Sequence, residues 1–390
     1  MTLCLCVSAV ITNAQIAVKG ETVWTMAGEP ISNGVVLIKD GKIEAVGTEG
    51  QVRIPTNYRV VSAKVVTPGL IDARTVVGLN GYLGQPHDQM AIDRSSSVQP
   101  ELRAIDAYDA RERLVTWLRE FGVTTLHTGH QPSALISGQT MIVKTTGNTV
   151  EEAMIKQTAM ISVALGQSGM GGQGRSPGTR SKAAAMLRAE LIKAQESAKK
   201  DDPPNDLKGE IMYRVIKGEV PLLVYAERSI DIMTALRIAD EFKIKIILEG
   251  AADAHMHLDE IKASGFPVIL HPTMARSGGD RENLSMETAG KLKAAGIPFA
   301  LQSGYEGYVP KTRVVLFEAG VAAANGLSRR DALASITIDA ARILGIDNRV
   351  GSLAVGKDAD IALYDGDPLE YATHCIGTII DGNIVSEVER

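Results

Sequence analysis

The sequence predicts an α/β protein, a (β/α)8 TIM barrel with a small composite β-sandwich domain formed by both termini. Residues 16–66 and 346–390 contain short runs that alternate apolar and polar residues, the pattern of half-buried strands. Residues 67–345 instead alternate short β-rich runs with amphipathic segments. Eight such alternations over roughly 280 residues are what this barrel requires. An open doubly wound sheet is the alternative arrangement of the same alternation.

The first element, residues 1–15 (MTLCLCVSAVITNAQ), is apolar, ends in small residues and contains no Lys or Arg. It predicts either a cleaved signal peptide or a buried N-terminal strand. A signal peptide would make the protein exported or periplasmic, and without one we expect it in the cytoplasm. Removal of this segment would leave Cys375 alone, so we expect no disulfide framework and no cysteine metal site. No other segment has the ~18 apolar residues of a membrane span.

The small domain is predicted from strands at both ends of the chain. The N-terminal strands lie in IAVKGETVWTM, GVVLIKDGKIEAVG and YRVVSAKVV, and the C-terminal strands in GSLAVGKDADIALYD and GTIIDGNIVSEV. Asp-Gly pairs in both groups predict tight hairpin turns. We therefore expect residues 16–66 and 346–390 to form one domain.

The barrel is predicted from the strand candidates between residues 67 and 345. In chain order they are VVTPGLIDA, GVTTLHT, QTMIVKTT, AMISVALG, VPLLVYAE, KIKIILEG, FPVILHP and IPFALQSG. Segments such as DARERLVTWLREF and DIMTALRIADEF have helical periodicity between them. The net charge of -5 and the lack of a basic run exclude a nucleic-acid surface, which leaves a small molecule or a protein as the partner.

Several motifs follow one another in a familiar order: NGVVLIKDGKIEAVG, VVTPGLIDA, GVTTLHT, PGTRSKAAAMLRAELIKAQ and VGSLAVGKDADIALYDGDP. In these motifs nearly the whole chain resembles the amidohydrolase superfamily, in particular its imidazolonepropionase-like and prolidase-like branch. The resemblance implies a metal-dependent barrel hydrolase that acts on C–N bonds in amides, cyclic amides or dipeptides. It also implies an oligomer, and a related amidohydrolase-like protein becomes a candidate partner.

The resemblance implies one or two divalent metals, usually zinc, at the carboxyl-terminal mouth of the barrel, where they activate water. The family's first strand ends in His-x-His, because residues i and i+2 of a strand share a face. Here Arg74 and Val76 stand at those two positions. A guanidinium has no lone pair to offer a metal, and valine has no polar atom.

The other metal positions implied by the resemblance also lack their usual residues. They fall on Tyr225 for the fifth strand, Gly250 for the sixth, Gly304 after the eighth, and Ser162 for the bridging lysine of the fourth. We therefore predict that the family's divalent metal is absent and that no other cofactor is bound.

The remaining polar residues at strand ends are candidates for a site. Glu227, Glu249 and Tyr225 are the candidate catalytic residues. The candidate substrate-binding residues, each with an alternative as a loop, packing or salt-bridge residue, are Arg74, His127, His130, Arg180 and His271. His255 and His257 form the one His-x-His, but they lie in a predicted helix, where residues two apart diverge, so we expect a structural or surface role.

Two loops border the predicted mouth. The run GMGGQG at residues 169–174 formally matches a dinucleotide-binding pattern, but its following helix begins too late, and a mobile loop over the mouth is the expected role. The segment with Asp88, Asp93 and Arg94 follows the first strand and is expected to be a solvated loop near the mouth.

Three functions remain after these observations. The first is a homologue that has lost metal-dependent hydrolysis and keeps a binding or assembly role. The second is a metal-independent hydrolase or lyase that uses Glu227 or Glu249 as general base with Arg74 and Tyr225. The third is an ordinary metal-dependent amidohydrolase with relocated ligands.

Overall fold

A computed structural model describes residues 15–171, 176–200, 203–272, 275, 277–305 and 314–388. The segment predicted as a signal peptide or a strand, residues 1–15, lies outside this description except for Gln15. Within the described ranges, no helix has the length and apolar character needed to cross a membrane.

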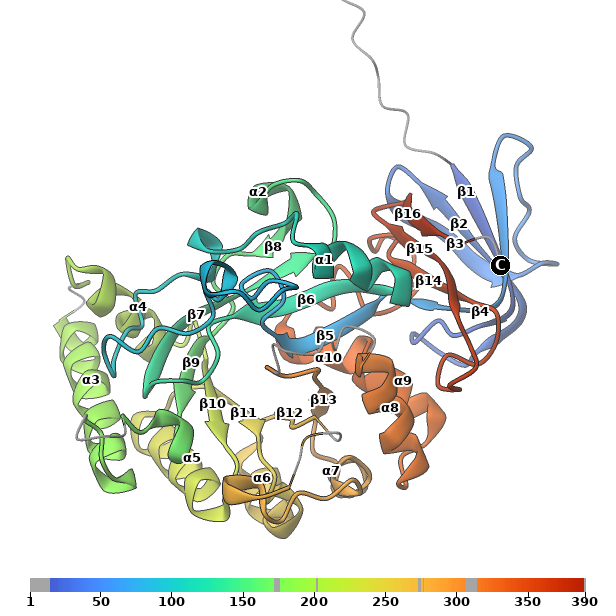
Figure 1. Ribbon diagram of the computed structural model, residues 1–390. Helices are drawn as coiled ribbons and strands as arrows, with labels where there is room; N and C mark the ends of the chain where they lie inside the picture. The colour runs from blue at the N-terminus through green and yellow to red at the C-terminus, as the bar shows by residue number, and fades with distance from the viewer. Residues whose placement is uncertain are drawn as a thin grey trace, which may run out of the picture.

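The small domain is one seven-stranded sheet built from both ends of the chain, in the order β16-β15-β14-β4-β1-β2-β3 (Figure 1). The strands are β1 (Ile16–Val23), β2 (Ile31–Lys39), β3 (Lys42–Thr48), β4 (Arg59–Pro68), β14 (Ile361–Tyr364), β15 (Cys375–Ile380) and β16 (Asn383–Glu387). Apolar residues from β1 to β4, β14 and β15 share one buried core. The composite domain is therefore a single sheet that curls around a core, where we expected a sandwich.

The two predicted Asp-Gly turns join neighbouring strands of this sheet. Asp40 and Gly41 connect β2 to β3 with φ of 50° and 77°, and Asp381 and Gly382 connect β15 to β16 with φ of 49° and 74°. Positive φ at both central residues is the requirement of the type I′ hairpin turn. Both hairpins predicted from the sequence are confirmed.

The large domain is a nearly closed barrel of eight strands in the order β5-β6-β7-β9-β10-β11-β12-β13. The strands are β5 (Leu70–Thr75), β6 (Val123–Gly129), β7 (Ile136–Lys144), β9 (Ile161–Ala164), β10 (Leu222–Ala226), β11 (Ile246–Gly250), β12 (Val268–Leu270) and β13 (Phe299–Leu301), and the short β8 (Met154–Lys156) pairs with β7. A parallel bridge between Thr75 and Gly304 joins the first strand to the segment after the last.

The third barrel strand corrects the expected topology. β7 runs antiparallel to both β6 and β9, whereas the other neighbouring pairs along the barrel are parallel. Six residues separate β6 from β7, and a parallel crossover needs a dozen or more. The barrel therefore contains one hairpin in place of one β/α alternation.

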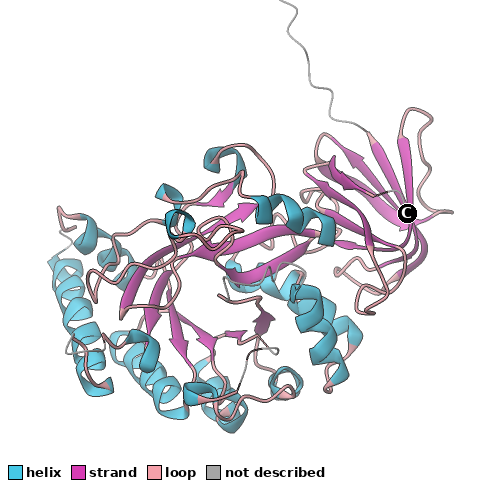
Figure 2. Ribbon diagram, viewed as in Figure 1, coloured by secondary structure: helices cyan, strands magenta, loops and turns pink. Residues whose placement is uncertain are grey.

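Helices cover the outside of the barrel (Figure 2). The α-helices are α1 (Arg113–Leu118), α2 (Val150–Ala153), α3 (Arg180–Lys200), α4 (Leu207–Ile216), α5 (Ser229–Phe242), α6 (Leu258–Ser264), α7 (Thr288–Ala295), α8 (Val314–Ala324), α9 (Arg329–Ser335) and α10 (Ile338–Leu344). The 3-10 turns are η1 (Pro86–Asp88), η2 (Ala104–Asp106), η3 (Arg119–Phe121), η4 (Gln167–Gly169), η5 (Ala254–Met256) and η6 (Gly279–Arg281). Ala340, Ala341 and Leu344 of α10 pack against apolar residues inside the barrel and close one end.

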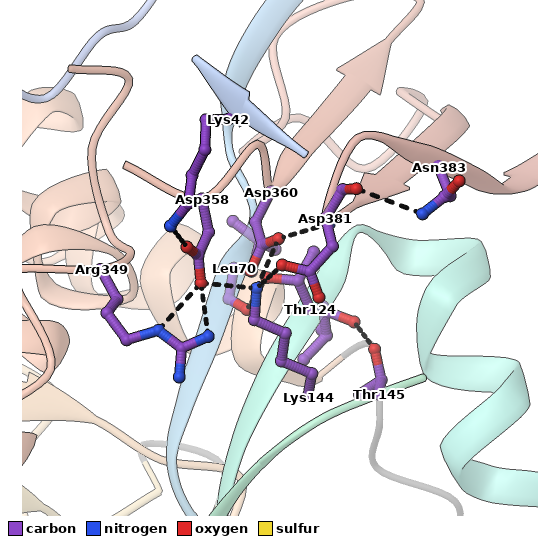
Figure 3. A network of polar contacts seen from close by, with 11 residues as sticks. Lys42, Leu70, Thr124, Lys144, Thr145, Arg349, Asp358, Asp360, Asp381 and Asn383 are labelled. Carbon is purple, nitrogen blue, oxygen red and sulfur yellow. Dashed lines mark hydrogen bonds and ion pairs between the residues drawn. The ribbon is translucent and has the colours of Figure 1, made fainter. Parts of the chain in front are cut away.

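A buried lysine joins the two domains. Lys144 at the end of β7 has its ammonium 2.9 Å from Asp358 Oδ2, 3.0 Å from Asp360 Oδ1 and 2.6 Å from Asp381 Oδ1 (Figure 3). Burial raises the pKa of Asp360 to about 6, against the attraction of Lys144. This network fixes the barrel to the small domain.

Candidate functional site

The barrel interior changes from apolar to polar toward the carboxyl ends of the strands. In β10 the inward-facing Leu223 is followed two residues later by Tyr225, and in β11 Ile247 is followed by Glu249. Because residues i and i+2 of a strand share a face, each strand adds one polar side chain above the apolar layer. The candidate site is this polar layer at the barrel mouth.

Arg74 lies in the middle of the polar layer and has no exposed surface. Its Nη1 donates to the carbonyl of Thr75 at 2.8 Å and to that of Gly129 at 3.4 Å, and its Nη2 donates to the carbonyl of His130. Its Cζ lies 5.1 Å from the centre of the Tyr305 ring. One guanidinium therefore joins the ends of β5 and β6 and packs against an aromatic face.

Glu249 supplies the opposite charge. Its Oε1 lies 3.4 Å from Arg74 Nε, and both side chains are fully buried. Neither oxygen of Glu249 has a hydrogen-bond partner in the described chain, and the 3.4 Å contact is an ion pair with a long N···O distance. Burial raises the pKa of Glu249 to about 7, although the charge of Arg74 acts in the opposite direction.

Glu227 lies next to this pair. Tyr225 donates its hydroxyl to Glu227 Oε1 at 2.6 Å, and the Ala252 N–H donates to Oε2 at 2.9 Å. Burial raises the pKa of Glu227 to about 7, and burial together with Glu227 raises that of Tyr225. The carboxyl of Glu227 packs closely against Gly250, where an added Cβ would lie 2.8 Å from Glu227 Cδ.

The histidines predicted near the mouth have different surroundings. His127 Nδ1 lies 2.7 Å from the carbonyl of Ala73, so it carries the proton and donates, and Nε2 accepts from the Thr140 hydroxyl at 2.6 Å. Burial lowers the pKa of His127 to about 3, which keeps the ring neutral. Both ring nitrogens form hydrogen bonds within the protein, so the surroundings of His127 fit a structural role.

His130 and His271 differ in how completely their hydrogen bonds are formed. His130 Nδ1 lies 3.3 Å from the carbonyl of Gln139, and burial lowers its pKa. His271 Nδ1 donates to the carbonyl of Pro272 at 3.1 Å, while its buried Nε2 has no partner in the described chain. Burial lowers the pKa of His271 to about 4, so this nitrogen is a free acceptor.

Arg180 forms ion pairs at the start of α3. Its Nε lies 2.8 Å from Asp231 Oδ1, and its Nη2 lies 3.2 Å from Asp280 Oδ1. Asp280 also accepts the Gln167 N–H at 2.8 Å. Of the two roles that the sequence left open for Arg180, the geometry favours the salt bridge at the helix start. The glycine-rich loop predicted over the mouth lies partly outside the described chain, at residues 172–175.

Comparisons with known proteins agree on one family. A family model described as "Amidohydrolase family" matches residues 287–386. The chain is 24% identical to the imidazolonepropionase of Geobacillus sp. (strain WCH70) over 379 residues, 86% of this chain and 84% of that protein. A crystal structure of an amidohydrolase from Thermotoga maritima MSB8 superposes with a TM-score of 0.90 at 26% identity, covering 96% of this chain and 100% of the other. The chain belongs to the amidohydrolase superfamily.

One relative is much longer than this chain. The amidohydrolase tasK of Hapsidospora irregularis is 22% identical over 406 residues, which cover 92% of this chain and 40% of that protein. The chain thus spans 40% of the length of this relative.

The residues at the positions where the resemblance predicts metal ligands have few groups that could coordinate a cation. Val76 is buried and apolar, and Ser162 is buried with its hydroxyl unpartnered in the described chain. Gly304 has a φ of 80°, and a Cβ there would lie 2.7 Å from Pro272 Cγ. Within the described ranges, no three or more His, Cys, Asp or Glu side chains are grouped so that they could hold a metal ion. The described residues therefore do not fit the divalent metal of the superfamily.

The remaining candidates are two histidines after β11 and three residues of the loop after β5. His255 lies in η5, and its Nδ1 is 3.1 Å from the carbonyl oxygen of Ala252. His257 precedes α6, and its Nδ1 is 3.7 Å from Glu260 Oε2. The expected helix is thus a 3-10 turn followed by a shorter α-helix. The predicted loop residues Asp88, Asp93 and Arg94 lie between β5 and α1, and Asp93 and Arg94 are exposed.

Sequence reasoning missed two parts of the mouth. Asp72 Oδ1 accepts the Ser303 N–H at 3.0 Å, and the Ser303 hydroxyl donates to Oδ2, which joins β5 to the segment after β13. Burial raises the pKa of Asp72 to about 6. Tyr305, which contacts Arg74, also lies 6.3 Å from Tyr225 between ring centres. The aromatic residue after Gly304 in the motif QSGYEG was the signal for Tyr305.

Proposed function

We propose that this chain is an amidohydrolase-superfamily protein without metal-dependent hydrolysis, and that its barrel serves to bind a small molecule or a related protein. The observation that supports this proposal most is the buried guanidinium of Arg74 in the polar layer. Arginine stays protonated and donates hydrogen bonds, so it cannot ligate a metal. Its charge would also repel a divalent cation strongly in a site that excludes water.

The backbone at two other positions supports the same proposal. Gly250 and Gly304 have φ of 81° and 80°, a region that side chains rarely adopt. A Cβ at Gly250 would meet the carboxyl of Glu227, and one at Gly304 would meet Pro272. Side chains that could reach a metal from these positions would therefore require movement of packed neighbours.

Arg74 and Glu249 give the mouth an internal charge balance. The guanidinium offsets the buried carboxylate of Glu249 and holds the carbonyls of Thr75, Gly129 and His130. A buried ion pair of this kind has a large desolvation cost, so it is weak evidence for stability but a strong constraint on which ions can enter. We expect the layer to select ligands by hydrogen bonding and shape.

The proposal is tested by elemental analysis and by activity. Protein produced with supplemental zinc, manganese, iron and cobalt should contain far less than one metal per chain. It should not hydrolyse a panel of amides, lactams and dipeptides, with or without added metal. An Arg74→Ala control should also lack metal, because the two glycine positions are unchanged. One bound metal per chain whose removal by a chelator abolishes turnover would overturn the proposal.

A second candidate is a metal-independent hydrolase or lyase. It is favoured by the raised pKa of about 7 at both Glu227 and Glu249, together with the unpartnered oxygens of Glu249. Either carboxylate would act as general base, Tyr225 would donate a hydrogen bond, and Arg74 would stabilise a developing anion. General-base catalysis contributes about 10²- to 10⁴-fold, so the substrate would have to be more reactive than an ordinary amide.

This candidate predicts turnover that chelators do not affect. Glu249→Gln or Glu227→Gln should abolish it, whereas Glu241→Gln on the surface of α5 should leave it unchanged. Absence of turnover on activated esters, lactams and elimination substrates would exclude this candidate and leave the binding role in place.

A further inference from the structure

A groove outside the polar layer lies between α1 and the loop that follows β5. Its lining includes Tyr82, Arg111, Arg113, Leu114, Trp117 and Glu120, and its volume is about 510 Å³. Sites for small molecules commonly measure ~300–1,000 Å³. None of these residues belongs to the barrel mouth, so the groove is independent of the proposed function.

The aromatic walls of the groove are held in place. Arg113 and Trp117 are four residues apart in sequence and share a face of α1. The Tyr82 N–H donates to Glu112 Oε1 at 2.8 Å, and the Arg113 Cζ lies 4.6 Å from the centre of the Tyr82 ring. Trp117 packs edge-to-face with Phe121, with ring centres 4.9 Å apart. A ligand would therefore meet two aromatic surfaces that are already positioned.

The charges of the groove are unbalanced. Arg111 and Arg113 are exposed, and neither forms an ion pair with a carboxylate within the described residues. Elsewhere arginines commonly do, as Arg188 does with Glu241 at 2.7 Å. Guanidinium groups bind carboxylates in a planar, often bidentate geometry. The two arginines therefore favour binding of an anionic group at this end of the groove.

We propose that this groove binds a small aromatic carboxylate. The ring lies against Tyr82 and Trp117, and the carboxylate accepts hydrogen bonds from Arg111 and Arg113. The exposed Glu120 borders the same groove and directs the anion toward the arginines by repulsion. A neutral analogue keeps the aromatic contacts but loses the charge-assisted hydrogen bonds, and an aromatic amine is repelled by the two guanidinium groups.

The test is a ligand-observed ¹⁹F NMR titration of the full chain with 4-fluorophenylacetate and, as its uncharged match, 4-fluorophenylacetamide. The acid should bind saturably and at least about tenfold more tightly than the amide, since each hydrogen bond to a charged group contributes about that factor or more. The double variant Arg111→Gln/Arg113→Gln should lose at least this tenfold preference. Arg237→Gln, an exposed arginine on α5 outside the groove, is the matched control and should bind like the unaltered chain.

A second measurement places the ligand in the groove. The chain has two tryptophans, so in a Trp24→Phe protein Trp117 is the remaining one. Its fluorescence should be quenched by 4-nitrobenzoate with the affinity that the NMR titration gives for an aromatic acid, and the quenching should disappear in the double variant. Equal binding of acid and amide, or unchanged binding in the double variant, would overturn the proposal. Binding without quenching of Trp117 would also overturn it, because the acid would then lie elsewhere.

Discussion

Replacing Arg74 with methionine removes the charge from the barrel mouth and keeps an unbranched side chain of similar length. We expect this single change to destabilise the folded protein strongly. It leaves the carbonyls of Thr75, Gly129 and His130 without their donor and leaves Glu249 without its counter-charge in a fully buried position.

The magnitude follows from these contacts. Three carbonyls that lose a donor cost about 1 kcal/mol each, so about 3 kcal/mol together. Removing one partner of a buried charge pair by itself usually costs about 3–5 kcal/mol, so we expect a total loss of at least about 3 kcal/mol. Adding Glu249→Leu should recover part of this cost, because no isolated buried charge remains. The double variant should therefore be more stable than Arg74→Met alone, with a coupling of about 2 kcal/mol or more.

The destabilisation caused by Arg74→Met should increase with pH, because Glu249 loses its proton as the pH rises. The pKa of Glu249 is about 7 in the folded protein, above its ordinary value of 4.5, so the folded state binds this proton more tightly. Its contribution to stability is complete below about 4.5 and is lost as the pH rises through 7. At pH 5.5 the carboxyl is protonated and methionine should cost less. Without Arg74 the pKa of Glu249 rises further, so at pH 8 the folded variant must take up a proton or bury an unpaired carboxylate, and methionine should cost more.

The assay is thermal unfolding followed by circular dichroism at both pH values. Arg228→Met is the control, because Arg228 pairs with Glu282 at 3.0 Å with both side chains about half exposed, and such pairs contribute at most about 1 kcal/mol. If Arg74→Met unfolds at the same temperature as the unaltered chain at pH 8, the pair does not organise the mouth. Additive effects of Arg74→Met and Glu249→Leu would refute the coupling.

Three further predictions concern the same structure. Gly250→His should destabilise the protein and should not produce metal binding, because its Cβ would meet Glu227 at 2.8 Å; calorimetry and elemental analysis test both parts. Lys144→Met should lower stability by about 3–5 kcal/mol, because Asp360 would lose its buried cation, and the loss should shrink below pH 6, near the raised pKa of that carboxyl. Glu249→Gln should reduce the fall in stability between pH 5 and pH 8, which unfolding temperatures across this range measure, and an unchanged pH profile would show that this carboxyl does not titrate there.

The strand positions could be read from the sequence, but one strand direction could not. All eight predicted strand segments occur in the barrel, because each is a short apolar run bounded by turns or helices. The alternation of residues in β7 is the same whether the strand runs parallel or antiparallel. The usable signal was the connection from Gly129 to Ile136, which is too short for a crossover helix.

The site was predictable to the level of strand ends. Arg74, Tyr225, Glu227 and Glu249 end or follow parallel strands, so their meeting at one edge of the barrel follows from topology. The topology does not predict which side chains contact one another, because these contacts depend on how the barrel closes. The bond from Ser303 to Asp72 joins residues 231 positions apart, and no local pattern encodes it.

Under the proposed function, the unusual residues of the mouth depend on one another. Arg74 brings a permanent positive charge into a dry layer, which is tolerable because Glu249 lies 3.4 Å away. Glu227 can place its carboxyl beside this pair because Gly250 has no side chain. Replacing one of these residues with a metal ligand would therefore leave an unpaired buried charge or a steric overlap at another. A return to metal binding would require coordinated changes, so stepwise variants should lose stability before they gain a metal.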